Sequence, residues 1–165
     1  MSITVQADAK IVYQPITAAD VNRLGSMVRL FGRENRLCDQ FNAPIDFKHF
    51  NYEVSSLIDM GVAFGFMAVQ DERVLGVILY TITKHTFTGL MSSSEIMWFV
   101  LPEYRNGSMG VRLLKMMEDD VEEQGVELSG MFYLKNSMPE KIGRFYEKRG
   151  YEETETQHLR RIYPR

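Results

Sequence analysis

The feature that most constrains the fold is a turn between an apolar run and an amphipathic helix. Residues 95–100 favour a β-strand, and Pro102 followed by an Asn-Gly dipeptide indicates a turn. Apolar side chains then recur at helical spacing over residues 111–121, and residues 126–134 again favour a strand. A strand, a helix and a strand in this order predict two parallel strands joined by a right-handed crossover.

The remaining patterns predict a β-hairpin and three further helices. Two β-favouring runs are separated by a short charged turn, which is typical of a hairpin, and Ser137 with Glu140 forms a capping-box pattern before a helix that Gly150 ends. The predicted strands cover residues 10–14, 63–69, 74–83, 95–100, 126–134 and 151–163, and the other predicted helices carry the apolar positions of residues 21–31 and 47–58. We therefore predict an α/β fold with a mixed sheet, in a single domain over residues 1–165.

Composition excludes several classes of function. The 165 residues suffice for one domain with its own core, and the net charge of -3 provides no positive field for nucleic acid. A single cysteine, Cys38, cannot form an internal disulfide, and the three histidines lack the spacing of metal ligands. The apolar runs are too short to span a bilayer and residues 1–10 lack a signal-peptide pattern, so we expect a cytoplasmic protein without metal or membrane. The sequence leaves the oligomeric state open, a homodimer included.

The turn carries the residues of a known motif. Val100, Pro102, Arg105 and Gly110 stand in register with the acetyl-CoA-binding motif of the GNAT superfamily of N-acetyltransferases, which this segment resembles. Ser108 replaces the first glycine of the motif, and a glycine stands one place earlier. The resemblance implies the GNAT fold, acetyl-CoA as cosubstrate, and cofactor binding by Val100, Arg105, Asn106, Gly107, Ser108, Met109 and Gly110.

The start of a helix suits a pyrophosphate for physical reasons that do not depend on the family. Its first N–H groups have no partner within the helix, and the helix dipole adds partial positive charge. Glycine lets the main chain approach phosphate oxygens closely, whereas the hydroxyl of Ser108 could cap the helix or bond to a phosphate. The alternative is an ordinary Asn-Gly turn without a ligand.

Residues 145–152 resemble the closing signature of the same family, an aromatic pair on a helix followed by glycine and another aromatic residue. The resemblance implies that Tyr146 is the general acid that protonates the departing thiolate of CoA. A tyrosine near sulfur can donate a proton as negative charge develops there. The alternative is that Tyr146 only packs its ring in the core beside Phe145.

Glu95 is a carboxylate in an otherwise apolar predicted strand. Many relatives in the family carry a base at this place. An amine is mostly protonated at neutral pH, so a carboxylate is needed to take its proton, and partial burial beside Met97 and Trp98 would raise the pKa of Glu95. The alternative is an exposed residue, or one paired with Lys84 or an arginine.

Together these patterns predict an N-acetyltransferase that moves an acetyl group from acetyl-CoA to a primary amine by direct attack. The acceptor, a small molecule or a protein amine, cannot be named from the sequence. The alternative is a GNAT-fold protein that binds acyl-CoA or a protein partner without catalysis.

Overall fold

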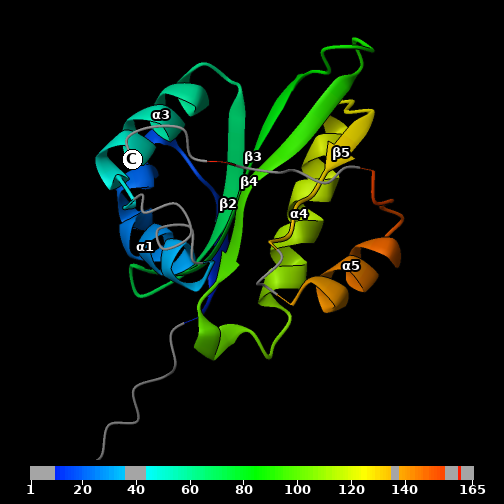
Figure 1. Cartoon of the computed structure of the whole chain (residues 1–165). Coiled ribbons are helices and arrows are strands. Elements are labelled where there is room, and N and C mark those ends of the chain that lie inside the picture. The colour runs from blue at the N-terminus through cyan, green and yellow to red at the C-terminus, as the bar shows by residue number, and fades with distance from the viewer. Residues whose placement is uncertain (1–9, 36–43, 135–137, 155–159, 161–165) are drawn as a thin grey trace, which may run out of the picture.

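A computed structural model describes residues 10–35, 44–134, 138–154 and 160. Its five strands form one sheet in the order β1-β2-β3-β4-β5. Helices α1 and α3 lie on one face of this sheet, and α4 and α5 lie on the other (Figure 1). The strands are β1 (Val12–Pro15), β2 (Ala63–Gln70), β3 (Arg73–Lys84), β4 (Met91–Val100) and β5 (Leu128–Gly130), and the helices are α1 (Gly25–Glu34), α3 (Phe47–Asp59), α4 (Met109–Glu123) and α5 (Pro139–Glu147), with the short 3-10 helices η1 (Ala18–Leu24) and η2 (Pro102–Tyr104).

The sheet is mixed, as predicted. Strands β1 to β4 pair in an antiparallel meander, and β4 pairs with β5 in parallel after the crossover through α4. The predicted hairpin is the β2–β3 pair, whose turn residues Asp71 and Glu72 have φ of 47° and 64°. A two-residue turn with positive φ at both positions matches the right-handed twist of the strands.

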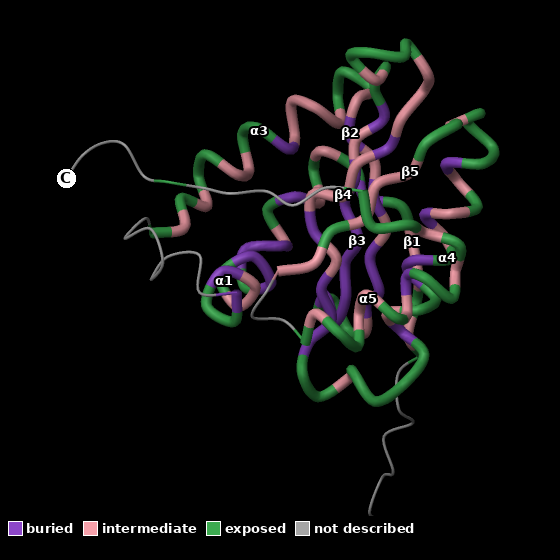
Figure 2. The backbone as a smooth tube through the Cα atoms, turned by 45° about the vertical axis from the view of Figure 1, so that its right-hand side comes forward, coloured by how far each residue is buried: buried purple, intermediate pink, exposed green. Residues whose placement is uncertain are grey.

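The core lies on both sides of β3. Val77, Ile78, Leu79 and Tyr80 each have 0% exposure, which requires that side chains of both orientations are covered. Figure 2 shows this continuous buried stretch through the centre of the molecule, with exposed residues on the outer helices and loops. The apolar helical faces predicted from the sequence supply the cover on each side.

Several predicted boundaries are wrong. The strand predicted over residues 126–134 is confined to Leu128–Gly130, and the strand predicted over residues 95–100 begins earlier, at Met91. The first predicted helix is divided into η1 and α1. Residues 151–154 form no strand, and the rest of that predicted strand, apart from position 160, lies outside the described residues, as does Ser137 of the capping box. Short apolar runs predict that an element exists better than they predict where it ends, because the ends of a helix or strand depend on its tertiary partners.

Candidate active site

Strands β4 and β5 part soon after they pair. Their register runs from Ser92 opposite Leu128 to Ser94 opposite Gly130 and goes no further among the described residues. Beyond this pair, the Phe132 N–H bonds to a side chain of β4 instead of to its main chain. The acceptor is Glu95 Oε2, at 3.1 Å. We call this place, from Glu95 on β4 and Phe132 after β5, the fork.

A β-bulge in β4 directs Glu95 into the fork. Leu79 is paired with Met97 and Tyr80 with Glu95, so Ile96 is an extra residue without an opposite partner. Paired residues of antiparallel strands project to the same face, and the Tyr80 hydroxyl donates to Asp120 on α4 at 2.5 Å. Glu95 therefore faces α4 and α5. In a regular ladder Ile96 would pair with Tyr80, and Glu95 would project to the opposite face.

The environment of Glu95 suits a base. Burial raises its pKa from 4.5 to about 7, and the backbone N–H groups of Phe132 and Trp98 oppose this rise. Of the ion pairs among the described residues, none involves Glu95, so the alternative of a salt bridge with Lys84 or an arginine finds no support. A carboxyl group with a pKa near neutrality can accept a proton and release it again at neutral pH.

Tyr146 lies on α5 at the other side of the fork. Its side chain is 6% exposed, and its hydroxyl donates to the Phe132 carbonyl oxygen at 3.1 Å. Burial raises the pKa of Tyr146 above its ordinary value, and the charge of Glu95 adds to this effect. Tyr146 is thus a core residue whose hydroxyl is directed at the fork, and its role as a general acid stays a prediction.

The turn before α4 presents mainly backbone. Residues 105–108 are exposed, Ser108 at the N-cap position makes no side-chain capping bond, and the first helical bond runs from the Arg112 N–H to the Ser108 carbonyl at 2.9 Å. The N–H groups of the first turn therefore have no partner within the helix. We call residues 101–110 the α4 turn.

The side chain of Arg105 points away from these N–H groups. Its Nε–H donates to the Val100 carbonyl at 2.8 Å, and its Nη2 pairs with Glu34 of α1 at 2.7 Å. The guanidinium also lies over the Phe99 ring, 4.9 Å from its centroid. Arg105 thus ties the α4 turn to β4 and α1, and what remains for a phosphate in the turn is the main chain.

Trp98 is a site residue that the sequence pattern did not identify as one. Its ring stacks on Phe145 with centroids 6.0 Å apart and lies 6.2 Å from Tyr146, while its Nε1–H donates to the Gly110 carbonyl at 3.1 Å. It joins β4 to the first turn of α4 and to α5. Residue spacing could not predict these contacts of a tryptophan in an apolar strand, because they join elements that are distant in the sequence.

Phe132 and Tyr151 were also missed as site residues. Phe132 is 60% exposed and acts through its main chain, which no residue pattern reveals. The Tyr151 ring lies 5.6 Å from that of Tyr146, and its hydroxyl donates to Glu118 of α4 at 3.4 Å. Glu118 also accepts from Arg149, so the acidic end of α4 helps to hold the segment that follows α5.

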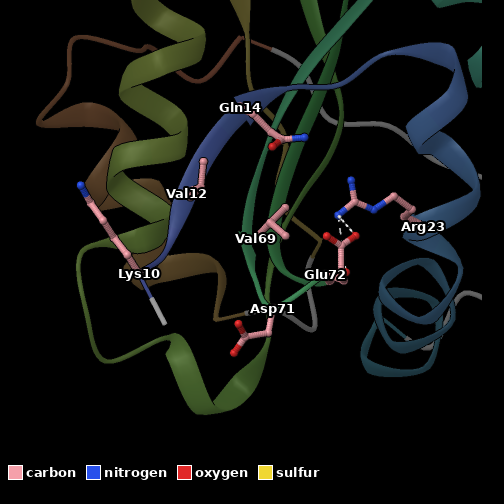
Figure 3. Close-up of a pocket in the computed structure, with 7 residues that line it drawn as sticks. All are labelled: Lys10, Val12, Gln14, Arg23, Val69, Asp71 and Glu72. Atoms are coloured by element: carbon pink, nitrogen blue, oxygen red, sulfur yellow. Dashed lines mark hydrogen bonds and ion pairs between the residues drawn. The ribbon is translucent and has the colours of Figure 1, made fainter. Parts of the chain in front are cut away.

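A hollow lined by polar groups lies elsewhere on the molecule. Figure 3 shows Arg23 of η1 and Glu72 of the β2–β3 turn pointing toward one another, with the Arg23 Nη2 and the Glu72 Oε2 3.8 Å apart. The other lining residues are Lys10, Val12, Gln14, Val69 and Asp71. None of the predicted site residues lines this hollow, and its lining combines both signs of charge. It is separate from the fork and the α4 turn.

Two searches of the described residues gave negative findings. No group of three or more His, Cys, Asp or Glu side chains there is placed to hold a metal ion. Within the same ranges, no helix has the length and apolar character needed to cross a bilayer.

The mixed five-stranded sheet, the crossover through α4 and the parting of β4 from β5 define an α/β protein of the GNAT fold. The chain belongs to the GNAT acetyltransferase family: the model of the acetyltransferase (GNAT) domain matches residues 63–153. The α4 turn, the fork and α5 all lie within this range. A comparison with curated proteins finds no match.

Solved structures agree on the fold. A ribosomal-protein-alanine N-acetyltransferase from Brucella melitensis biovar Abortus 2308 is 13% identical, with a TM-score of 0.68 over 93% of this chain and 100% of that one. An aminoglycoside acetyltransferase from an uncultured soil metagenomic sample, in complex with sisomicin, is 14% identical, with a TM-score of 0.70 over 93% and 97%. A predicted acetyltransferase from Clostridium acetobutylicum with acetyl-CoA is 17% identical, with a TM-score of 0.70 over 92% and 96%. At these identities the likeness establishes the fold alone.

Proposed function

We propose that the chain is an N-acetyltransferase that moves an acetyl group from acetyl-CoA to a primary amine by direct attack. The observation that carries the proposal is the fork, where a carboxyl group with a pKa of about 7 and a buried phenol bond to the N–H and the carbonyl of one residue, Phe132. A base and an acid held this close can serve the two proton transfers of one acyl transfer. We further propose that the whole chain is one domain, since its strands share one sheet.

The α4 turn fits the pyrophosphate of CoA. A Cβ added at Gly107 would meet only the Tyr104 carbonyl, at 3.8 Å, so the exposed main chain is open to a ligand. The unpaired N–H groups of the first turn and the helix dipole favour an anion there. In this proposal Gly107, Ser108, Met109 and Gly110 hold the phosphates by main chain, while Arg105 and Val100 shape the turn and Asn106 lies at its exposed tip.

Each proton has a route in this proposal. The amine nitrogen forms a bond to the thioester carbonyl carbon, and Glu95 takes the proton that the nitrogen must lose. The carbon–sulfur bond then breaks, and Tyr146 donates its hydroxyl proton to the sulfur, so that CoA leaves as a thiol. A thiol has a lower ordinary pKa than a phenol, so the raised pKa of Tyr146 opposes this donation unless the surroundings of Tyr146 change before the sulfur departs.

The acceptor belongs to the chemical class of amines. Two proteins of the same fold are named for a ribosomal-protein alanine and for aminoglycosides, and both kinds of acceptor present amino groups. An amine acceptor would also suit a chain with a net charge of -3. The choice among amines depends on the walls of the acceptor side.

The test has two stages with wild-type protein. Calorimetric titration with acetyl-CoA measures binding, and release of free CoA thiol is then followed with a panel of small amines, lysine peptides and peptides with free N-termini. We expect micromolar binding and thiol release that depends on one class of amine. Absence of binding at these concentrations would refute the proposal.

A second candidate function is binding of acyl-CoA without catalysis. The observation in its favour is that the Tyr146 hydroxyl already donates its single proton to the Phe132 carbonyl. A phenol that never leaves this bond cannot protonate sulfur. Acetyl-CoA binding with no thiol release across the whole amine panel would favour this candidate.

A further inference from the structure

The main chain of Phe132 occupies an unusual position, because both candidate catalytic side chains bond to the same residue. Its N–H donates to Glu95 Oε2 and its carbonyl accepts from the Tyr146 hydroxyl, both at 3.1 Å. The Phe132 side chain is 60% exposed and cannot explain this arrangement by packing. Its main chain is available because β5 has already left β4, so that these groups have no strand partner there.

We propose that the main chain of Phe132 is a positioning group that couples Glu95 to Tyr146, so that a proton taken up by Glu95 loosens the hydroxyl proton of Tyr146 for the leaving sulfur. This inference rests on the proposed function. It assigns a positioning role to the main chain of Phe132 and none to its side chain.

The physical basis is the position of the Phe132 main chain, which both hydrogen bonds share. A charged Glu95 attracts the Phe132 N–H and favours a tight, aligned arrangement of the loop that carries both polar groups of that residue. The N–H and the carbonyl of Phe132 belong to neighbouring peptide groups joined at its Cα, so a shift of this main chain moves both hydrogen bonds. While Glu95 is charged, the Tyr146 proton is therefore held toward the Phe132 carbonyl.

Protonation of Glu95 reverses this effect. The charge of Glu95 is one of the causes that raise the pKa of Tyr146, so its neutralisation makes Tyr146 a stronger acid. Glu95 gains its proton when it deprotonates the amine, and this step precedes departure of the thiolate. Tyr146 therefore becomes a stronger acid before the sulfur leaves and needs a proton.

The charged and titratable groups around the fork are consistent with this coupling. Tyr133 lies next to Tyr146 with ring centroids 6.5 Å apart, and Tyr151 lies at 5.6 Å. Behind Tyr151, the cation of Arg149 is paired with Glu118 on α4. The main influence of charge on Tyr146 is therefore that of Glu95, with Tyr151 second.

A titration followed by NMR tests the coupling without any need for turnover. In wild-type protein we expect the Phe132 amide signal and the Tyr146 ring ¹³Cζ signal to move together with a midpoint of about 7, the pKa of Glu95. Both movements should vanish in Glu95→Gln, which keeps an oxygen acceptor but cannot titrate. A Phe132 amide that does not follow Glu95, or a Tyr146 signal that stays fixed while the amide moves, would overturn the inference.

A pair of variants at position 132 adds a kinetic test. Phe132→Pro removes the N–H and Phe132→Ala keeps it while removing the exposed ring. We expect turnover of Phe132→Pro to be roughly tenfold below that of Phe132→Ala, with the pH at half-maximal turnover moved upward. Equal turnover and pH profiles of the two variants would contradict the inference.

The two tests separate the possible failures. If wild-type protein releases no thiol with any amine, the proposed function fails, and the NMR titration still decides whether the coupling exists. If circular dichroism shows that Phe132→Pro does not fold, the titration of wild type and Glu95→Gln decides alone.

Discussion

The α4 turn and the fork present their chemical groups in opposite ways. The α4 turn offers exposed main chain, with Ser108 making no capping bond and the Arg105 side chain directed elsewhere. The fork offers a half-buried carboxyl group and a buried phenol, each held by a specific hydrogen bond. Main-chain binding tolerates changes of residue, whereas a proton donor or acceptor cannot be replaced, so the two regions should respond very differently to substitution.

Tyr146→Phe should give the largest effect. The change removes only the hydroxyl, and the ring, which packs against Trp98, is retained. If Tyr146 protonates sulfur, turnover should fall by roughly 100-fold while acetyl-CoA affinity is unchanged. Thiol release measures the first quantity and calorimetry the second.

Tyr133→Phe is the matched control, because it removes the hydroxyl of a neighbouring tyrosine that donates to Glu153. Its turnover should stay close to that of wild type. Wild-type turnover in Tyr146→Phe as well would leave Tyr146 with a packing role alone.

Glu95→Gln should lower turnover and remove a limb of the pH profile. In wild type only the ionised carboxylate accepts a proton, so turnover should rise with pH through about 7. The variant should lose this rise. Glu127→Gln is the control, since the Glu127 carboxylate also accepts a backbone N–H, that of Met91, at the opposite end of the β4–β5 pair. A pH profile that is the same in wild type and Glu95→Gln would exclude Glu95 as the base.

The raised pKa of Glu95 also has a consequence for stability. Because the folded-state pKa of about 7 lies above the unfolded value near 4.5, the folded state holds its proton longer than the unfolded state does. As pH rises from 4.5 to 7, the free energy of unfolding of wild type should therefore fall relative to that of Glu95→Gln. Urea unfolding of both proteins across this range measures the difference.

The fold was largely predictable because periodicity reports which faces are buried. The apolar, β-favouring runs of β2 and β3, and the helical spacing along α4, follow from local sequence and survive tertiary packing. The end of β5 could not be predicted in this way. β5 ends at Gly130, and beyond it the Phe132 N–H bonds to the Glu95 side chain instead of to the main chain of β4. This contact joins residues far apart in the sequence, so no local pattern reveals it.

The sequence predicted Glu95 and Tyr146 as candidate site residues, but it did not predict Trp98, Phe132 or Tyr151, nor the geometry that joins them. The positions of Glu95 and Tyr146 came from family resemblance, and their meeting at Phe132 depends on a bulge at Ile96 that no pattern announces. Arg105 is a further example, because its place in the motif does not indicate where its side chain points. Its pairing with Glu34 of α1 depends on how the helix packs on the sheet.

Arg105→Gln and Glu34→Gln should give intermediate effects that separate two roles of Arg105. If Arg105 only ties the α4 turn to α1, both variants should lose the same acetyl-CoA affinity, about threefold, in keeping with a half-exposed ion pair. The double variant should then lose no more than either single one. A clearly larger loss in Arg105→Gln than in Glu34→Gln would show that the guanidinium binds phosphate itself.

Ser108→Gly should give the smallest effect, although it restores the glycine of the family motif. The Ser108 side chain makes no capping bond, so its loss should cost at most a few tenths of a kcal/mol of stability. If the hydroxyl neither crowds nor contacts the phosphates, acetyl-CoA affinity should stay within about twofold of wild type in both Ser108→Gly and Ser108→Ala, because the N–H groups of the turn remain. Tighter binding in Ser108→Gly alone would mean that the Cβ of Ser108 holds the pyrophosphate away from the main chain. Weaker binding in both variants would instead assign the hydroxyl a bond to phosphate, and main-chain binding at the turn would then be incomplete.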